Sequence, residues 1–64
     1  MKIQIIKRTG RLNEGDIVTK IEKPKNEDNK MSYSAWVEMG TGTWPLLRHE
    51  YKELPKEDYP EYYL

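Results

Sequence analysis

Cysteine is absent from this chain of 64 residues, and His49 is its only histidine. Without cysteine the protein can form neither a disulfide bond nor a thiolate metal site, which fits a reducing compartment. One imidazole alone cannot hold a zinc ion or complete a serine–histidine pair, so we expect His49 to be a surface residue. The carboxylates show no pair at a defined spacing, and the glycines form no phosphate-binding loop. We therefore expect no enzymatic activity, no metal and no cofactor.

Long hydrophobic runs are also missing. The longest near the beginning is the pair Ile5 and Ile6, which is too short for a signal peptide or a membrane span. We therefore expect a soluble, cytoplasmic protein. The length allows one domain with a thin core, because a chain of this size buries only about 60% of the surface that its unfolded form exposes.

The net charge is zero, but the charges are unevenly distributed. The first eleven residues carry no acid and four basic side chains, Lys2, Lys7, Arg8 and Arg11. Residues 50–64 carry five acidic side chains against two lysines. This asymmetry could steer a partner or be neutralised within the chain. The overall balance argues against a dedicated nucleic-acid binder, which normally has a basic excess.

Short segments of alternating apolar and polar residues, broken by turn residues, predict an all-β fold. We expect strands at residues 2–7, 16–23, 31–39, 43–44 and 52–54. A solvated loop is expected at 25–30, a hairpin turn at 40–42, and a helical or 3₁₀ turn within 46–51. Pro45 must lie at a strand end or on an edge strand, since it cannot donate to a ladder. Residues 56–64 form an acidic, tyrosine-rich tail that we expect to be ordered only if its aromatic side chains dock.

The segment from 31 to 39 is the clearest predicted strand. Alternation places Tyr33, Ala35, Val37 and Met39 on one face and Ser34, Trp36 and Glu38 on the other. If the first face is the core, the indole of Trp36 points outward, where a rigid aromatic side chain suits an interface. The alternative is that a loop or the tail covers it. Trp44 is expected in the core, because so small a core needs a large side chain.

The order of these segments resembles the SH3-like β-barrel family. The matching stretches are LNEGDIV (12–18), AWVEM (35–39) and GTWPLLRHEYKEL (42–54). They are similar to the family's Leu-x-x-Gly-Asp-hydrophobic stretch, its tryptophan strand, and its Gly-x-hydrophobic-Pro close ending in an acidic-Leu pair. The resemblance implies a single five-stranded SH3-like barrel over residues 1–55, followed by the tail at 56–64.

The family's groove for proline-rich peptides is matched only in part. Trp36 and Pro45 occupy groove positions, but KIQIIKRT stands where the family has a tyrosine-bearing segment. Arg48 takes the place of the family's tyrosine after the proline, and Tyr51 is displaced by an insertion. The resemblance therefore implies the scaffold, and a scaffold does not determine function.

We predict a non-enzymatic protein-interaction module. The partner-binding residues would be Trp36, Glu38, Arg48, Tyr51, Tyr59, Tyr62 and Tyr63. Small, neutral, cysteine-free chains of this fold are often accessory proteins of phages or other mobile elements that bind a host protein, which is an association with the fold alone.

Two alternatives stay open. A KOW- or Tudor-like barrel could bind nucleic acid through Lys2, Lys7, Arg8 and Arg11 together with the aromatic residues, although the same cations could simply protect a strand edge. A homodimer could form if the tail of one chain covered the barrel of the other.

Overall fold

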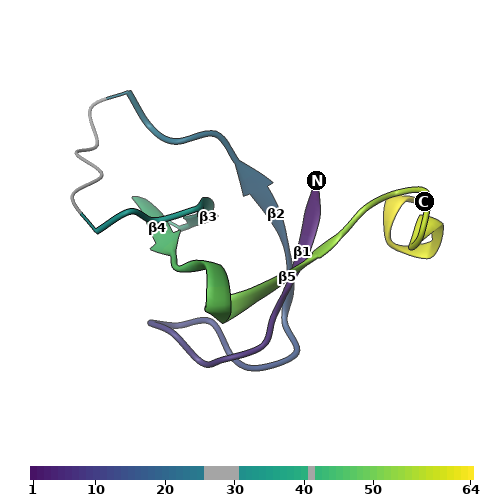
Figure 1. Cartoon of the computed structure of the whole chain (residues 1–64), viewed down its shortest axis with the longest axis horizontal. Helices are drawn as coiled ribbons and strands as arrows, with labels where there is room; N and C mark the ends of the chain where they lie inside the picture. The colour runs from purple at the N-terminus through teal and green to yellow at the C-terminus, as the bar shows by residue number, and fades with distance from the viewer. Residues whose placement is uncertain (26–30, 41) are drawn as a thin grey trace.

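Five short strands and two 3₁₀ helices make up the computed structural model, which describes residues 1–25, 31–40 and 42–64 (Figure 1). In chain order these are β1 (Lys2–Ile5), β2 (Ile17–Ile21), β3 (Ala35–Met39), β4 (Gly42–Leu46), η1 (Arg48–Glu50), β5 (Tyr51–Leu54) and η2 (Pro60–Tyr63). No α-helix occurs among these described residues. The all-β prediction is confirmed.

The strands form one antiparallel sheet in the order β4-β3-β2-β1-β5. The central strand β2 pairs with β1 on one side and with β3 on the other. β5 pairs with β1, and β4 pairs with β3. β4 and β5 form no ladder with each other in the described structure, so the five-stranded sheet is not closed as a barrel. The connection between β1 and β2 contacts the edge strand β4. Thr9 Oγ1 in this connection accepts a hydrogen bond of 3.0 Å from Trp44 Nε1.

Several element boundaries differ from the sequence prediction for local reasons. β1 ends at Ile5, although the backbone N–H of Ile6 still donates to the carbonyl of Glu50 in the register of the β1–β5 ladder. β3 begins at Ala35, since Ser32 has φ 56° and interrupts the extended chain. Pro45 lies in the edge strand β4, and η1 is the short turn expected before the last strand, so both predictions are confirmed. The predicted loop lies mostly at 26–30, outside the described residues, as does position 41 of the hairpin.

The main core lies on one face of the curved sheet. Its buried members are Ile3, Ile5, Leu12, Ala35, Val37, Leu46 and Tyr51, with Val18 and Met39 packed against them. Alternation explains which side chains face this core. The pair Ile3 and Ile5 in β1 and the pair Ala35 and Val37 in β3 each occupy alternate positions of their strand. Burial of these aliphatic side chains is the main favourable contribution to folding.

Candidate functional site

Trp36 is buried, which corrects the prediction of an exposed indole. It lies on the face opposite Ala35 and Val37, as alternation predicts, but only 6% of its surface is exposed. Ile21 of β2 and Pro45 of β4 stand directly beside it in the sheet. The Tyr33 ring meets it edge-on, with 6.4 Å between centroids. The alternative of a covering loop residue is therefore confirmed, and Trp36 is part of the packing.

The alternation predicted from residue 33 fails before β3 begins. Tyr33 packs against Trp36 on the outer face, whereas the Ser34 hydroxyl lies 2.8 Å from the hydroxyl of the core residue Tyr51. Residues 32–34 lie outside any strand, so the two-residue repeat of an extended strand does not apply to them.

The structure does not bring the predicted binding residues Glu38, Arg48 and Tyr51 together on one surface. Glu38 is exposed near the end of β3, opposite Thr43. Arg48 and Tyr51 line a shallow depression of about 100 Å³ together with Glu53. Tyr51 is only 7% exposed and belongs to the core. Its ring therefore offers a partner little surface.

The tail tyrosines anchor the C-terminal segment on β1 and β5. The hydroxyl of Tyr63 accepts a hydrogen bond of 2.6 Å from the Lys2 backbone N–H and donates one to the Leu54 carbonyl. Lys2 and Leu54 face each other at the end of that ladder, so the hydroxyl bridges the last pair. Tyr59 and Tyr62 lie 6.2 Å apart, centroid to centroid.

Lys52 holds the other end of the tail. Its Nζ lies 5.1 Å from the centre of the Tyr59 ring, a cation–π contact. Hydrogen bonding to the Tyr59 side chain, reinforced by the electrostatic effect of the same residue, raises the pKa of Lys52 above its ordinary value. The ammonium is therefore charged at neutral pH. Tyr59 and Tyr63 serve the fold, and Tyr62, 39% exposed, is the most accessible tail ring.

The four basic residues of the alternative site are separated. Lys2 belongs to β1 and donates from Nζ to Thr19 Oγ1 at 2.8 Å. Lys7, Arg8 and Arg11 are exposed in the connection between β1 and β2. Among the described residues the one ion pair joins Lys20 to Glu53, at 3.7 Å, so none of these three cations is neutralised there. The basic beginning does not pair with the described acidic end.

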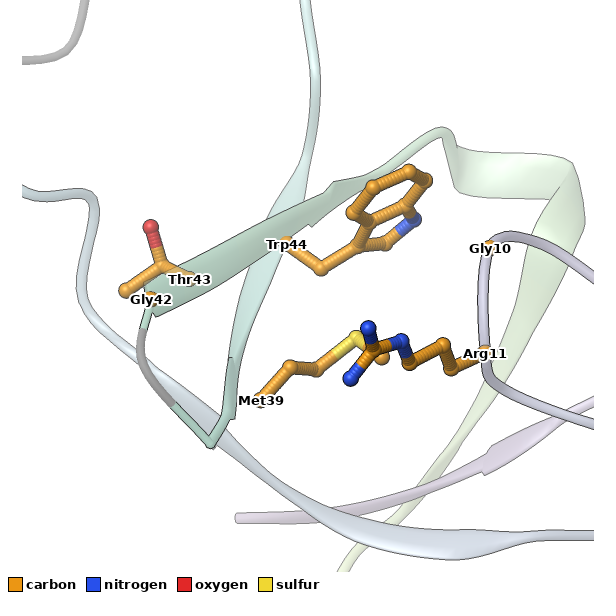
Figure 2. Close-up of a pocket in the computed structure, with 6 residues that line it drawn as sticks. All are labelled: Gly10, Arg11, Met39, Gly42, Thr43 and Trp44. Carbon is orange, nitrogen blue, oxygen red and sulfur yellow. The ribbon is translucent and has the colours of Figure 1, made fainter.

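An apolar pocket lies where that connection meets the β3–β4 hairpin (Figure 2). Its volume is about 270 Å³, and it is lined by Gly10, Arg11, Met39, Gly42, Thr43 and Trp44. Trp44 contributes one wall with its indole, and the Met39 and Arg11 side chains reach toward each other below that ring (Figure 2). Segments far apart in the sequence therefore build this candidate site.

A tight turn at Thr9–Leu12 fixes the indole. Thr9 and Leu12 exchange backbone hydrogen bonds of 2.9 and 3.1 Å, and φ is +56° at Gly10 between them. A glycine at the first central position with positive φ is typical of a type II′ turn. The turn carries Gly10 so close to Trp44 that a Cβ there would lie 2.7 Å from Cζ2. The indole thus rests on glycine backbone and is tied to Thr9 by its N–H.

Trp44 is 37% exposed, which corrects its expected place in the core. It opposes Val37 and therefore faces the core side, but it lies toward the hairpin end of the edge strand β4. The sequence interpretation missed this pocket. The signal that could have found it is Thr9-Gly10-Arg11-Leu12, a two-residue turn flanked by residues able to pair.

Within residues 1–25, 31–40 and 42–64, no group of three or more His, Cys, Asp or Glu side chains could hold a metal ion. No helix there has the length and apolarity needed to cross a membrane. In comparisons with protein-family models, curated proteins and solved structures, no match to this chain is found.

Proposed function

We propose that this chain is a non-enzymatic protein-interaction module that binds its partner at the pocket beside Trp44. The observation that carries the proposal is the state of this indole, which is fixed by the Thr9 hydrogen bond and by Gly10 yet remains 37% exposed. A rigid, accessible aromatic side chain beside an apolar hollow is what binding hot spots use, since little side-chain entropy is lost on contact.

We further propose an SH3-like scaffold for the module. Three features support it: the strand order β4-β3-β2-β1-β5, the sharing of β2 between two ladders, and the 3₁₀ turn η1 directly before β5. The proposed contact surface differs from the family's peptide groove, because the two groove positions matched here, Trp36 and Pro45, lie on the outer face. Trp36 is buried there and Pro45 is half-buried.

Gly42 allows a direct test of the pocket. It is two residues from Trp44 on β4 and therefore shares its face. A Cβ at this position would meet no atom within 4 Å, and its φ lies outside the left-handed region. Gly42→Leu should therefore fill part of the pocket without straining the backbone, and Gly42→Ala is the matched control.

The experiment is selection of a displayed random-peptide library on the wild-type protein, followed by titration of the enriched peptides. We expect Gly42→Leu to weaken their binding by about tenfold or more, and Gly42→Ala by less than about threefold. The two variants should have thermal midpoints close to that of the wild type. Enriched peptides that bind Gly42→Leu unchanged, or a library in which nothing is enriched, would contradict the proposed function.

A second candidate function is binding of single-stranded nucleic acid. The observation in its favour is the position of Arg11 at the same pocket as Trp44, because exposed aromatic rings and cations together hold stacked bases and phosphates. Its signature is a steep fall of affinity with the logarithm of salt concentration. A peptide anchored mainly by its apolar side chain should lose much less affinity over the same salt range.

An accessory role in a phage or another mobile element stays an association with the fold. A homodimer formed through residues 56–64 stays a prediction that light scattering, with and without those residues, can decide. In the single chain the tail packs on β1 and β5 of its own sheet.

A further inference from the structure

The dimensions and walls of the pocket suit one apolar side chain. A volume of about 270 Å³ falls just below the range of roughly 300–1,000 Å³ that is typical of small-molecule sites. The indole of Trp44 and the thioether of Met39 provide polarisable apolar surface on two sides (Figure 2). A leucine-sized or aromatic anchor on a partner segment could fill the space that these side chains enclose.

The described lining of the pocket carries positive charge only. Arg11 is the one ionisable residue among the described residues that line it, and its side chain extends toward Met39 (Figure 2). Lys7 and Arg8 are exposed in the same connection, and no described acidic side chain forms an ion pair with any of the three. A guanidinium can hold a carboxylate through two parallel hydrogen bonds, and this geometry is specific to planar anions.

Resting on the function proposed above, we propose that the pocket selects an acidic peptide segment in which an apolar side chain lies next to a carboxylate. The apolar side chain enters between Trp44 and Met39, and Arg11 binds the neighbouring carboxylate. Lys7 and Arg8 add long-range attraction for further acidic residues of the same segment. The proposed partner is thus a protein, and its acidic residues complement the positive charges of Arg11, Lys7 and Arg8.

The protein's two indole N–H groups provide the readout. Trp44 Nε1 lies at the pocket, whereas Trp36 is buried on the outer face and serves as an internal reference. Full-length protein labelled with ¹⁵N is titrated with the peptide Gly-Asp-Leu-Glu-Gly. The same titration is made with the amide peptide Gly-Asn-Leu-Gln-Gly, the serine peptide Gly-Asp-Ser-Glu-Gly and a short oligothymidylate.

We expect the acidic leucine peptide to shift the Trp44 signal and to bind about fivefold to tenfold more tightly than the amide or serine peptide. Arg11→Gln should abolish the preference for acid over amide. Arg48→Gln is the matched control, because it removes the same charge from an exposed arginine outside the pocket, and it should retain that preference.

Three outcomes would overturn the inference. Equal affinity for the acidic and amide peptides would refute the charge selection and leave the binding function intact. Tighter binding of oligothymidylate that depends on Arg11 would identify a nucleic acid as the occupant. Failure of every probe to move the Trp44 signal would refute the inference, and the library-selected peptides then decide whether the binding function fails with it.

Discussion

The contact between Gly10 and Trp44 makes a prediction that a single methyl group can test. Gly10 and Gly40 have nearly the same positive φ, +56° and +60°. A Cβ on Gly40 would meet no atom within 4 Å, whereas one on Gly10 would lie 2.7 Å from Cζ2 and 2.8 Å from Cε2 of the indole. Gly10→Ala and Gly40→Ala are therefore both strained by a positive φ, and Gly10→Ala in addition collides with Trp44.

The difference in stability between the two variants can be worked out from this comparison. In both variants alanine in the left-handed region costs about 1–2 kcal/mol, partly offset by about 0.4–1 kcal/mol from the lower entropy of the unfolded chain. Gly10→Ala must in addition displace the indole, which loses the 3.0 Å hydrogen bond to Thr9, worth about 0.5–1.5 kcal/mol, and part of its packing. We expect Gly10→Ala to be less stable than Gly40→Ala by about 1–3 kcal/mol.

Thermal unfolding followed by far-ultraviolet circular dichroism measures this difference. For a domain of this size each kcal/mol corresponds to roughly 4–8 °C in midpoint temperature, so the gap should be easily resolved. Tryptophan fluorescence of the folded Gly10→Ala protein should shift to longer wavelength as Trp44 moves into water, and that of Gly40→Ala should not. Equal midpoints and equal spectra would show that the indole does not rest on Gly10, and the account of the pocket would be wrong.

Three further predictions concern residues outside the pocket. Trp36→Ala should destabilise the fold by about 3–5 kcal/mol in urea unfolding, as expected for a buried aromatic residue, and a loss of binding without a loss of stability would contradict its burial. Tyr63→Phe removes the hydroxyl that bridges two backbone groups, so it should cost about 1–2 kcal/mol and speed hydrogen exchange at the Lys2 amide. Glu53→Gln breaks the exposed 3.7 Å pair with Lys20 and should change stability by less than about 1 kcal/mol in the same unfolding assay.

Much of the fold could be predicted from local patterns. The alternation of Ile3 and Ile5, and of Ala35 and Val37, correctly identified strands and their core face. The rule that proline avoids central ladders correctly placed Pro45 at an edge. These predictions succeeded for the same reason. Side-chain alternation and the missing N–H of proline are local properties that act in any extended strand, whatever the rest of the fold.

The roles of the two tryptophans could not be predicted in the same way. Alternation gives the face on which a side chain lies but does not say what covers that face. Trp36 faces outward, and Tyr33 and its strand neighbours cover it, while Trp44 faces inward at a sheet edge and stays partly open. Both outcomes depend on contacts between segments distant in the chain, above all the one between Gly10 and Trp44.

The folded chain holds its acidic tail away from the pocket. Three acidic residues of the tail are exposed, Glu57, Asp58 and Glu61, and the tail itself is held on β1 and β5 by Tyr63 and Lys52. In Figure 1, η2 lies at the opposite end of the molecule from β3 and β4, whose hairpin borders the pocket. The tail of the same chain therefore cannot reach the pocket while these contacts hold. Because the acidic tail does not neutralise Arg11, the charge asymmetry of the sequence supports the proposed recognition of a partner better than neutralisation by the tail.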